Sequence, residues 1–284
     1  MILVDNSQIV LSHLFQIMKY HDIKDCKDLL RHMILNTYRM YRSRFHDKYG
    51  ELVICNDSGK VWRRDIFPYY KQNRRTKRDT SDIDWDAAYT VLSEVKQEFA
   101  MNLPYKNIQV ERTEADDIIA VLAKKYCETE KVLILSSDKD FQQLQVHPNI
   151  EQFSPLKKEM VRCTNPSYYL VEHIIRGDSS DGVPNIFSDD DSCVSPDKRQ
   201  KPCMMKKVRQ VIDEFNESGS FEDEYIQRNW CRNKNVIDLN EIPSNIQDEI
   251  IATYENAHVA DRSKLFDYFF GSGLVDLMGS IQEF

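Results

Sequence analysis

Residues 114–140 read EADDIIAVLAKKYCETEKVLILSSDKD, and this stretch decides the fold. The run Val132–Leu135 is short, wholly apolar and rich in branched side chains, which is typical of a strand buried on both faces inside a parallel sheet. The residues from Ile118 to Leu122 repeat apolar side chains as a helix does. A helix followed by a buried strand predicts an α/β fold.

Acidic residues flank this helix and this strand. Asp138 and Asp140 directly follow the strand, at the carboxyl end where an open α/β sheet places its ligands, and two residues apart they project to the same side. Glu114 and Asp116 lie at the start of the helix. Converging carboxylates repel one another unless a cation neutralises them, and hard oxygen ligands suit Mg²⁺ or Mn²⁺. Taken singly, each of these acids also fits a plain role at a helix start or in a turn.

The composition describes a soluble globular protein of one large or two modest domains, with 284 residues, 41% hydrophobic and 30% charged. No apolar run reaches the length of a membrane span, and no signal peptide is evident, so a cytoplasmic location is expected. The seven cysteines are scattered without a C-x-x-C pair, which favours reduced thiols over disulfides or a zinc site. The histidines show no ligand spacing and are expected to be surface or packing residues.

The net charge of −8 argues against a polyanionic partner, but one segment has the opposite charge. Between residues 60 and 78 there are eight basic residues against one acid, Asp65. Aromatic side chains are interleaved with them: Trp62, Phe67, Tyr69 and Tyr70. Bases stack on aromatic rings while Arg and Lys hold phosphates, so the mixture suits a nucleic-acid strand; a solvated charged face is the alternative.

Two further buried strands are predicted to end in an acid. Ile2–Val4 leads directly into Asp5, and Glu51–Cys55 leads through Asn56 into Asp57. A short strand at Ile108–Val110 precedes Thr113, which we expect to cap the next helix. If Glu114 and Asp116 share one site, Glu114 must lie at the non-helical start of that helix or act through water.

The pattern of strand, helix and strand therefore places six acids at one edge of a parallel sheet. The motif GDSSDGVP at residues 177–184 adds Asp178 and Asp181, for which an exposed turn is the alternative. Two metal ions about 4 Å apart at such a site can activate water and stabilise a leaving oxygen on phosphorus. The candidate metal ligands are Asp5, Asp57, Glu114, Asp116, Asp138, Asp140, Asp178 and Asp181.

Beyond the sheet, the chain is predicted to be mostly helical. The polar span Ser188–Pro202 is the best candidate for a mobile insertion. Helices are predicted at residues 166–175, 204–215, 222–232, 243–254 and 264–270.

Six motifs in order now carry a family resemblance: VDNS at Val4, CND at Cys55, WRRD with YYKQNR at Trp62 to Arg74, TEADD at Thr113, SSDKDF at Ser136 and GDSSDGVP at Gly177. This series resembles the flap endonuclease and 5′-nuclease family, and within it the ribonuclease H branch of T-even-like bacteriophages. The resemblance covers nearly the whole chain. It implies a PIN/5′-nuclease-like fold, with a central, mostly parallel sheet flanked by helices and a smaller, mostly helical C-terminal region.

The resemblance also implies an activity. It implies a 5′-to-3′ exonuclease and flap endonuclease with two Mg²⁺ ions, or Mn²⁺, that removes RNA primers and adjoining DNA in lagging-strand replication. The implied domains are residues 1–165, the metal-binding core with a basic arch-like segment at 60–85, and residues 166–284, a helical DNA-binding region. The implied location is the host cell cytoplasm, with the protein as a monomer.

Residue roles follow by motif. The eight acids look like the metal ligands, with Asp178 and Asp181 as the second-metal group. Lys71 and Arg63 look like the basic pair at the scissile phosphate, with Arg64 as the rival of Arg63, and Tyr70 looks like a base-stacking residue. Many relatives place a glycine-rich potassium-binding turn after the GDSSDGVP motif, whereas residues 185–194 here read NIFSDDDSCV. Nucleic-acid contacts are expected from Arg74, Arg75, Lys198, Arg199, Lys201, Lys206 and Lys207.

The expected partners are DNA and RNA–DNA hybrid with a 5′ flap or a 5′ end. The C-terminal helix and Phe284 could dock a sliding clamp or a single-strand-binding protein; a packed terminal helix is the other interpretation. A PIN-type ribonuclease would share the sheet and the acids, but it is ordinarily shorter and lacks the basic segment. A non-catalytic DNA-binding replication factor would need only the basic surface. A haloacid-dehalogenase-type phosphatase needs D-x-D after the first strand, where Asp5 is followed by Asn6 and Ser7.

Overall fold

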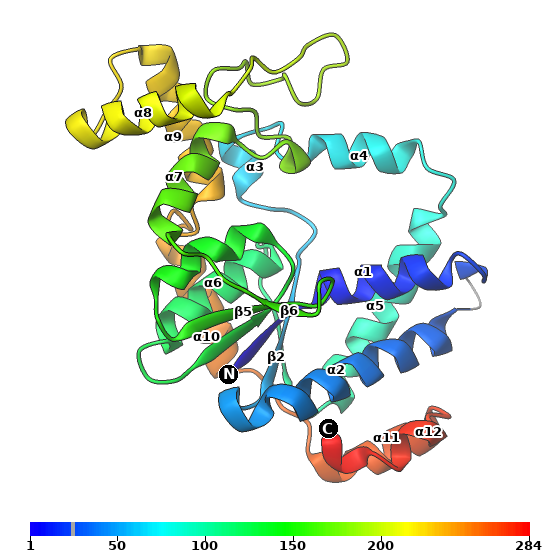
Figure 1. Cartoon of the computed structure of the whole chain (residues 1–284). Helices are drawn as coiled ribbons and strands as arrows, with labels where there is room; N and C mark the ends of the chain where they lie inside the picture. The colour runs from blue at the N-terminus through cyan, green and yellow to red at the C-terminus, as the bar shows by residue number, and fades with distance from the viewer. Residues whose placement is uncertain (24–25) are drawn as a thin grey trace. The chain divides into compact units, whose positions relative to one another are not determined.

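The computed structural model describes residues 1–23 and 26–284, apart from the side chain of Lys77. The chain forms two compact units, which are described separately (Figure 1). The sheet unit comprises residues 1–59, 84–162 and 245–284, and the helical unit comprises residues 60–83 and 163–244.

The sheet unit is built on six strands in the order β3-β2-β1-β4-β5-β6. The first five are parallel, and β6 runs antiparallel to β5 at one edge. The predicted mostly parallel sheet is confirmed. The strands are β1 Ile2–Asp5, β2 Leu52–Asn56, β3 Lys106–Gln109, β4 Val132–Leu135, β5 Ile150–Ser154 and β6 Glu159–Val161.

Strand β1 lies at the centre of the sheet. Leu3 pairs with Val53 of β2 on one side and with Ile134 of β4 on the other. The chain runs outward from β1 through β2 to β3 and then returns to the other side of β1 with β4. This reversal is the topological switch point, where open α/β sheets bind their ligands at the carboxyl ends of the strands.

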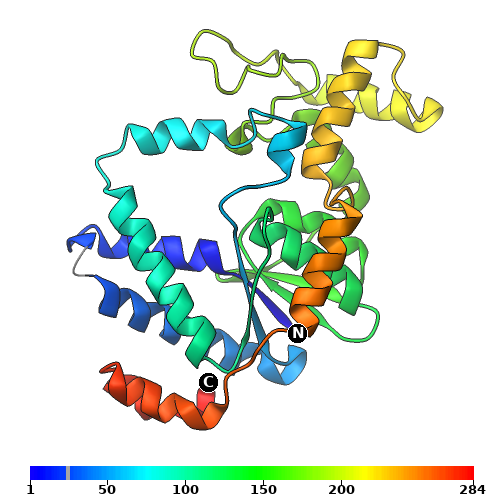
Figure 2. The ribbon, with the colours of Figure 1, turned by 180° about the vertical axis from the view of Figure 1, so that it is seen from behind.

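Helices cover both faces of this sheet (Figures 1 and 2). Helix α6 packs against β1, β2, β3 and β4, while α1, α2 and α5 pack against β1, β2 and β3. Every residue of β1, β2 and β4 is buried, as the apolar runs predicted. The helices of this unit are α1 Asn6–Ile17, α2 Lys27–Tyr49, α5 Trp85–Asn102, α6 Ala115–Tyr126, α10 Ser244–Glu255, α11 Leu265–Gly271 and α12 Val275–Met278, with 3₁₀ helices η2 Lys139–Val146, η4 Arg262–Lys264 and η5 Ile281–Glu283.

The helical unit has its own apolar core, which includes Ile174, Val211 and Trp230. Its polar span is a loop closed at its base, because the Asn185 N–H donates to Gln200 Oε1 (2.8 Å) and the Lys201 N–H donates to Ser188 Oγ (2.8 Å). The predicted mobile insertion is therefore fastened at both ends. The helices are α3 Arg63–Ile66, α4 Gln72–Asp79, α7 Pro166–Arg176, α8 Met205–Ser218 and α9 Glu224–Ile237, with the 3₁₀ helix η3 Ser179–Asp181.

Thr113 is not the N-cap of α6; that position is taken by Glu114, and the Thr113 hydroxyl donates to the Val110 carbonyl (2.9 Å). The domain boundaries expected from the sequence, residues 1–165 and 166–284, stay a prediction. The compact units of the structure divide the chain differently: segment 60–83 groups with residues 163–244, and residues 245–284 group with the sheet. No helix in the described part of the chain is long and apolar enough to cross a membrane.

Candidate active site

Asp5 lies where the central strand turns directly into α1. It is the last residue of β1 and the N-cap of α1, and its carboxylate accepts a hydrogen bond from the Gln8 N–H (3.2 Å). A second bond comes from the Ser136 hydroxyl (2.8 Å). The side chain is buried, so this carboxylate is held rigidly at the switch point of the sheet.

The neighbouring strand contributes Asp57, which follows β2. Its carboxylate accepts a hydrogen bond from the Ala115 N–H (2.7 Å), the first residue of α6. A helix start attracts anions through its exposed N–H groups, which explains the pairing. Glu114 has extended dihedral angles (φ −98°, ψ 162°), and its N–H donates to Asp117 in a capping box. Glu114 therefore occupies the non-helical start that the sequence required if it shares a site with Asp116.

Strand β4 contributes the last pair of acids at this edge. Asp138 is the N-cap of the 3₁₀ helix η2 and accepts a hydrogen bond from the Asp140 N–H (2.9 Å). The Asp138 N–H donates to Ser136 Oγ (3.0 Å), and the same hydroxyl donates to Asp5. Ser136 thus connects the ends of β1 and β4 at the topological switch point.

The electrostatics of this edge are unfavourable without a cation. The pKa of Asp5 is raised to about 6, mainly by burial and also by the charges of Asp57 and Asp138, while the hydrogen bonds from Ser136 and Gln8 oppose the shift. Burial, together with the charges of Asp5 and Asp116, also raises the pKa of the Cys55 thiol. Negative charge is therefore concentrated here, which favours a bound cation.

The donor set fits a hard divalent cation. Six acids lie in the sheet unit at this edge: one ends β1, others follow β2 and β4, and two lie at the start of α6. Carboxylate oxygens are the ligands that Mg²⁺, Mn²⁺ and Ca²⁺ prefer. The structure places the six acids at the ends of these strands or at the start of α6, and the charges of Asp57 and Asp138 act on Asp5. The six are Asp5, Asp57, Glu114, Asp116, Asp138 and Asp140.

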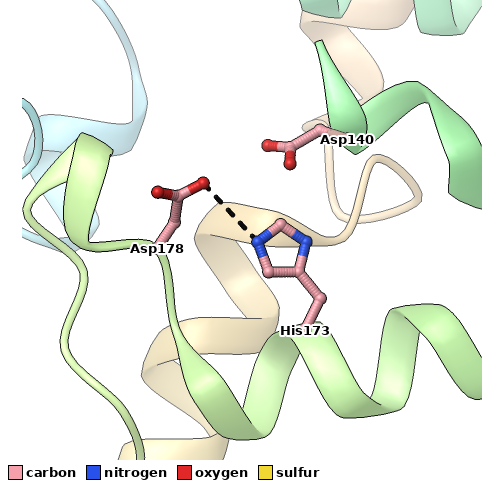
Figure 3. Close-up of side chains that lie close together, drawn as sticks. All are labelled: Asp140, His173 and Asp178. Carbon is pink, nitrogen blue, oxygen red and sulfur yellow. Dashed lines mark ion pairs between the residues drawn. The ribbon is translucent and has the colours of Figure 1, made fainter.

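The other two candidate acids lie in the helical unit. Asp178 is buried, accepts hydrogen bonds from the Ser180 N–H (2.8 Å) and hydroxyl (2.6 Å), and lies 3.5 Å from His173 Nε2. Figure 3 shows the His173 ring turned toward the Asp178 carboxylate. A tight turn follows, with an isolated bridge between Asp178 and Val183.

Asp181, at the end of this turn, is surrounded by the basic segment. The Tyr70 hydroxyl donates to its carboxylate (3.2 Å), Lys71 Nζ lies 3.4 Å away, and Arg74 forms a short ion pair with it. The Lys71 N–H also donates to the Asp181 carbonyl (2.7 Å), with Lys71 in the left-handed region at φ 56°. The turn and the basic segment therefore form one local structure.

Two residues of the basic segment with predicted contacts to nucleic acid, Arg63 and Tyr70, are buried in this unit. Arg63 is 2% exposed, donates from Nε to the Val236 carbonyl (2.8 Å) and lies over the Trp62 ring, whereas Arg64 is exposed. Tyr70 is 4% exposed and supports Asp181. The phosphate contact predicted for Arg63 and the base stacking predicted for Tyr70 stay predictions.

The other predicted nucleic-acid contacts lie at the surface of the helical unit. All of them are exposed: Arg74, Arg75, Lys198, Arg199, Lys201, Lys206 and Lys207. Arg74 pairs with Asp181, and Lys198 Nζ lies 2.9 Å from the Asp191 carboxylate.

A guanidinium contacts the segment directly after the GDSSDGVP motif. Many relatives bind potassium in the turn that follows this motif. Arg232 of α9 is buried and donates to the carbonyls of Pro184 (3.0 Å) and Asn185 (3.4 Å), directly after the GDSSDGVP motif. No sequence motif indicated Arg232, and the sequence predicted only a surface or packing role for His173. The one signal for His173 was its position five residues before Asp178 on an apolar helix.

Carboxylates at the switch point of a parallel sheet fit a class of metal-dependent enzymes that act on phosphate esters. A family model described as the 5′-3′ exonuclease, N-terminal resolvase-like domain, matches residues 1–172, and one described as T4 RNase H, C terminal, matches residues 165–284. The chain therefore belongs to the 5′-3′ exonuclease family, and the resemblance inferred from the motifs is confirmed.

Individual relatives agree with this assignment. The chain is 33% identical over 293 residues to ribonuclease H of Enterobacteria phage T4, covering 99% of this chain and 95% of that protein. It is 28% identical over 152 residues to flap endonuclease Xni of Shewanella oneidensis, covering 50% of this chain and 54% of that protein. The fold is shared with the flap endonuclease of bacteriophage T5, solved with DNA and metal ions, at a TM-score of 0.64 and 15% identity, covering 90% of this chain and 98% of that one.

Proposed function

We propose that this protein is a Mg²⁺-dependent 5′-to-3′ exonuclease and flap endonuclease that removes RNA primers and adjoining DNA during lagging-strand replication. The observation that carries the proposal is the set of six carboxylates at the switch point of the sheet. The family membership and the names of the relatives, ribonuclease H and flap endonuclease, support the activity and the substrate class.

The acids of the sheet edge would hold the divalent ions, and Asp178 and Asp181 are proposed as the second-metal group. Bound Mg²⁺ supplies a nucleophile by lowering the pKa of water and polarises the phosphoryl oxygens. The chain contributes rigid placement, because Ser136 fixes Asp5 and the start of α6 fixes Asp57. The T5 relative was solved with metal ions, which supports a divalent metal without selecting Mg²⁺.

The basic segment is proposed to hold the substrate phosphate. Lys71 is positioned by its own backbone bond to Asp181, and its ammonium lies at the same carboxylate. An ammonium at this place offsets the negative charge that develops on phosphate oxygens during cleavage. The exposed Arg64 is the second candidate for this role, because Arg63 is committed to packing.

The substrates we propose are DNA and RNA–DNA hybrid with a 5′ flap or a 5′ end. The T5 relative was solved with DNA, which supports a nucleic-acid substrate. A sliding clamp or single-strand-binding protein as partner, a monomeric state and a location in the host cell cytoplasm stay predictions. Phe284 is buried against Phe269, so the packed terminal helix is the arrangement found.

The test is cleavage of a 5′-labelled flap duplex. We expect products with Mg²⁺ and none with EDTA, because the carboxylates have no catalytic cation in its absence. Asp138→Asn should abolish cleavage while binding of the duplex in Ca²⁺ persists. The control is Asp267→Asn, which changes an exposed aspartate of α11. Full activity of the Asp138→Asn variant would remove the metal assignment, and metal-independent cleavage would remove the mechanism.

A further inference from the structure

The Asp181 carboxylate is enclosed by positive charges of the chain itself. Arg74 forms a short ion pair with one of its oxygens, and Lys71 Nζ and the Tyr70 hydroxyl lie 3.4 Å and 3.2 Å from the other. Only 9% of the surface of Asp181 is exposed. Both carboxylate oxygens are thus occupied, and two cations surround one anion.

Backbone contacts hold the basic segment against this acidic turn. The Lys71 N–H donates to the Asp181 carbonyl (2.7 Å). The side-chain amide of Asn73 donates to the carbonyls of Ser179 (2.9 Å) and Ser180 (3.3 Å). Helix α4 and the 3₁₀ helix η3 therefore lie side by side within the helical unit (Figures 1 and 2). The two ion pairs form where the backbone already places their partners.

The backbone of Lys71 is strained in this arrangement. Its dihedral angles, φ 56° and ψ 20°, lie in the left-handed region, where a Cβ comes too close to the following carbonyl oxygen. Residues persist in this region only when their surroundings enforce the conformation, and they gather at segments that change conformation in function. Release of Lys71 from Asp181 would therefore relieve strain and favour a second arrangement of the segment.

The closed arrangement excludes a divalent cation from Asp181. The ion pairs direct the lone pairs of the carboxylate toward N–H donors, and the charges of Lys71 and Arg74 repel another cation at the same oxygens. Substrate phosphate competes with the carboxylate, because guanidinium and ammonium groups bind both kinds of oxygen. Lys71 is also the group proposed above to hold that phosphate. The same two side chains thus have two alternative partners, Asp181 and the substrate.

We propose that Lys71 and Arg74 keep Asp181 closed to a divalent cation until a substrate phosphate draws them away. The exchange is balanced in charge, because the phosphate replaces the carboxylate beside the two basic groups and the cation replaces the basic groups beside the carboxylate. Substrate and second metal ion therefore bind cooperatively, since each favours the open form of Asp181. Arg74 becomes a positioning residue that links metal binding to substrate binding. The proposal rests on the proposed nuclease function.

Calorimetric titration of the metal-free protein with Ca²⁺, without nucleic acid, tests the closed form. The wild type should bind a second ion weakly. Arg74→Met should tighten this second step by about tenfold, because one of the two positive charges at Asp181 is gone. Arg74→Lys should behave like the wild type, since it keeps the charge. Circular dichroism checks that each variant is folded, and a damaged fold would not produce a gain in metal affinity.

The matched control is Arg75→Met, which removes the same charge one residue away on α4. Arg75 is exposed, and its guanidinium lies 4.0 Å from the Asp79 carboxylate. This variant should bind Ca²⁺ as the wild type does. In the Asp181→Asn background the effect of Arg74→Met should disappear, because the carboxylate on which it acts is lost. An unchanged second step in Arg74→Met, an equal gain in Arg75→Met, or a gain that persists in Asp181→Asn would each overturn the inference.

The affinity for a 5′-flap duplex, followed by fluorescence anisotropy as Ca²⁺ is raised, tests the link to the substrate. Wild-type affinity should increase by about tenfold as the second ion binds, and Asp181→Asn should lose this increase. An equal increase in both proteins would overturn the inference while the nuclease assignment stands. If the wild type binds neither Ca²⁺ nor Mn²⁺ and cleaves no flap duplex, the proposed function fails and this inference fails with it.

Discussion

At the scale of single residues, the carboxylates at the carboxyl-terminal edge of the sheet repel one another. Asp5 is buried among other carboxylates, and its pKa of about 6 lies above its ordinary value of 3.8. Two hydrogen bonds from the chain reduce this cost without removing it. A buried carboxylate of this kind is tolerated because a bound cation reverses the sign of the local interaction.

The first prediction concerns the metal-free protein. Between pH 6 and pH 4 the folded state holds a proton on Asp5 that the unfolded state has lost, so stability rises as the pH falls through this window. The change is up to about 3 kcal/mol. Urea unfolding in EDTA at several pH values measures it, and Asp5→Asn should flatten the profile. Addition of Mg²⁺ should stabilise the protein more at pH 7.5 than at pH 5. A wild-type profile as flat as that of Asp5→Asn would contradict the raised pKa.

The second prediction concerns Lys71. Lys71→Met should reduce turnover on a flap duplex by on the order of a hundredfold with a small change in affinity, because we propose that the ammonium offsets charge that develops during cleavage. Arg75→Ala, which removes an exposed guanidinium of α4, should instead weaken binding and leave turnover unchanged. Single-turnover rates and equilibrium binding in Ca²⁺ separate the two effects. A loss confined to affinity in Lys71→Met would assign Lys71 to positioning alone.

At the scale of elements, the turn between α7 and the closed loop determines where Asp178 and Asp181 lie. Gly177 has φ +66°, and a Cβ there would come within 2.5 Å of the carbonyls of Val183 and Pro184. Gly182 has φ +75° and approaches the Tyr69 carbonyl. Both glycines are needed because backbone lies where a side chain would begin.

The third prediction follows from this close approach. Gly177→Ala should destabilise the protein by about 3 kcal/mol, through a left-handed residue with a Cβ and a clash with backbone that cannot move aside. Gly271→Ala, at the end of α11 with no atom within 4 Å of the added Cβ, should be neutral or stabilising. Urea denaturation of both variants provides the comparison. Equal stabilities would show that the turn relaxes without cost.

At the scale of the whole molecule, the sheet unit is assembled from three separate parts of the chain. The C-terminal segment completes the core of this unit, because Phe284 and Phe269 are fully buried and their ring centroids lie 5.0 Å apart. The Tyr105 hydroxyl donates to the Phe284 carbonyl (2.9 Å), and Arg42 donates to the Glu283 carbonyl (3.2 Å). The end of the chain is thus part of the hydrophobic core that begins at β1.

The fourth prediction is that residues 1–165, expressed alone, do not fold cooperatively. The fragment would expose the surface that Phe269, Leu274 and Phe284 cover in the intact chain. In the full-length protein, Phe284→Ala should cost about 3 to 5 kcal/mol, as for other buried phenylalanines. Thermal unfolding followed by circular dichroism measures both. A sharp transition of the fragment near that of the full chain would show that the C-terminal segment is dispensable.

Local sequence patterns were sufficient to predict much of the fold of this protein. Apolar runs and helical periodicity predicted strands β1 to β4 and helices α6 to α11 within a few residues, because burial on both faces and amphipathic repeats are local patterns. Acids that end parallel strands must meet at one edge, so the position of Asp5, Asp57 and Asp138 followed from topology alone. The motif series, read in order, predicted the family.

Only the tertiary structure decided which side chains are buried and what each one contacts. Ser136 bonds both Asp5 and Asp138, Arg63 turns to a carbonyl of α9, and Phe284 closes a core formed mainly by the first half of the chain. Such contacts join residues far apart in the chain, by 179 positions between Tyr105 and Phe284 and by 241 between Arg42 and Glu283. Periodicity reports only which face of an element is apolar. Hydrogen bonds, ion pairs and raised pKa values depend on neighbours that the folded chain alone brings into contact.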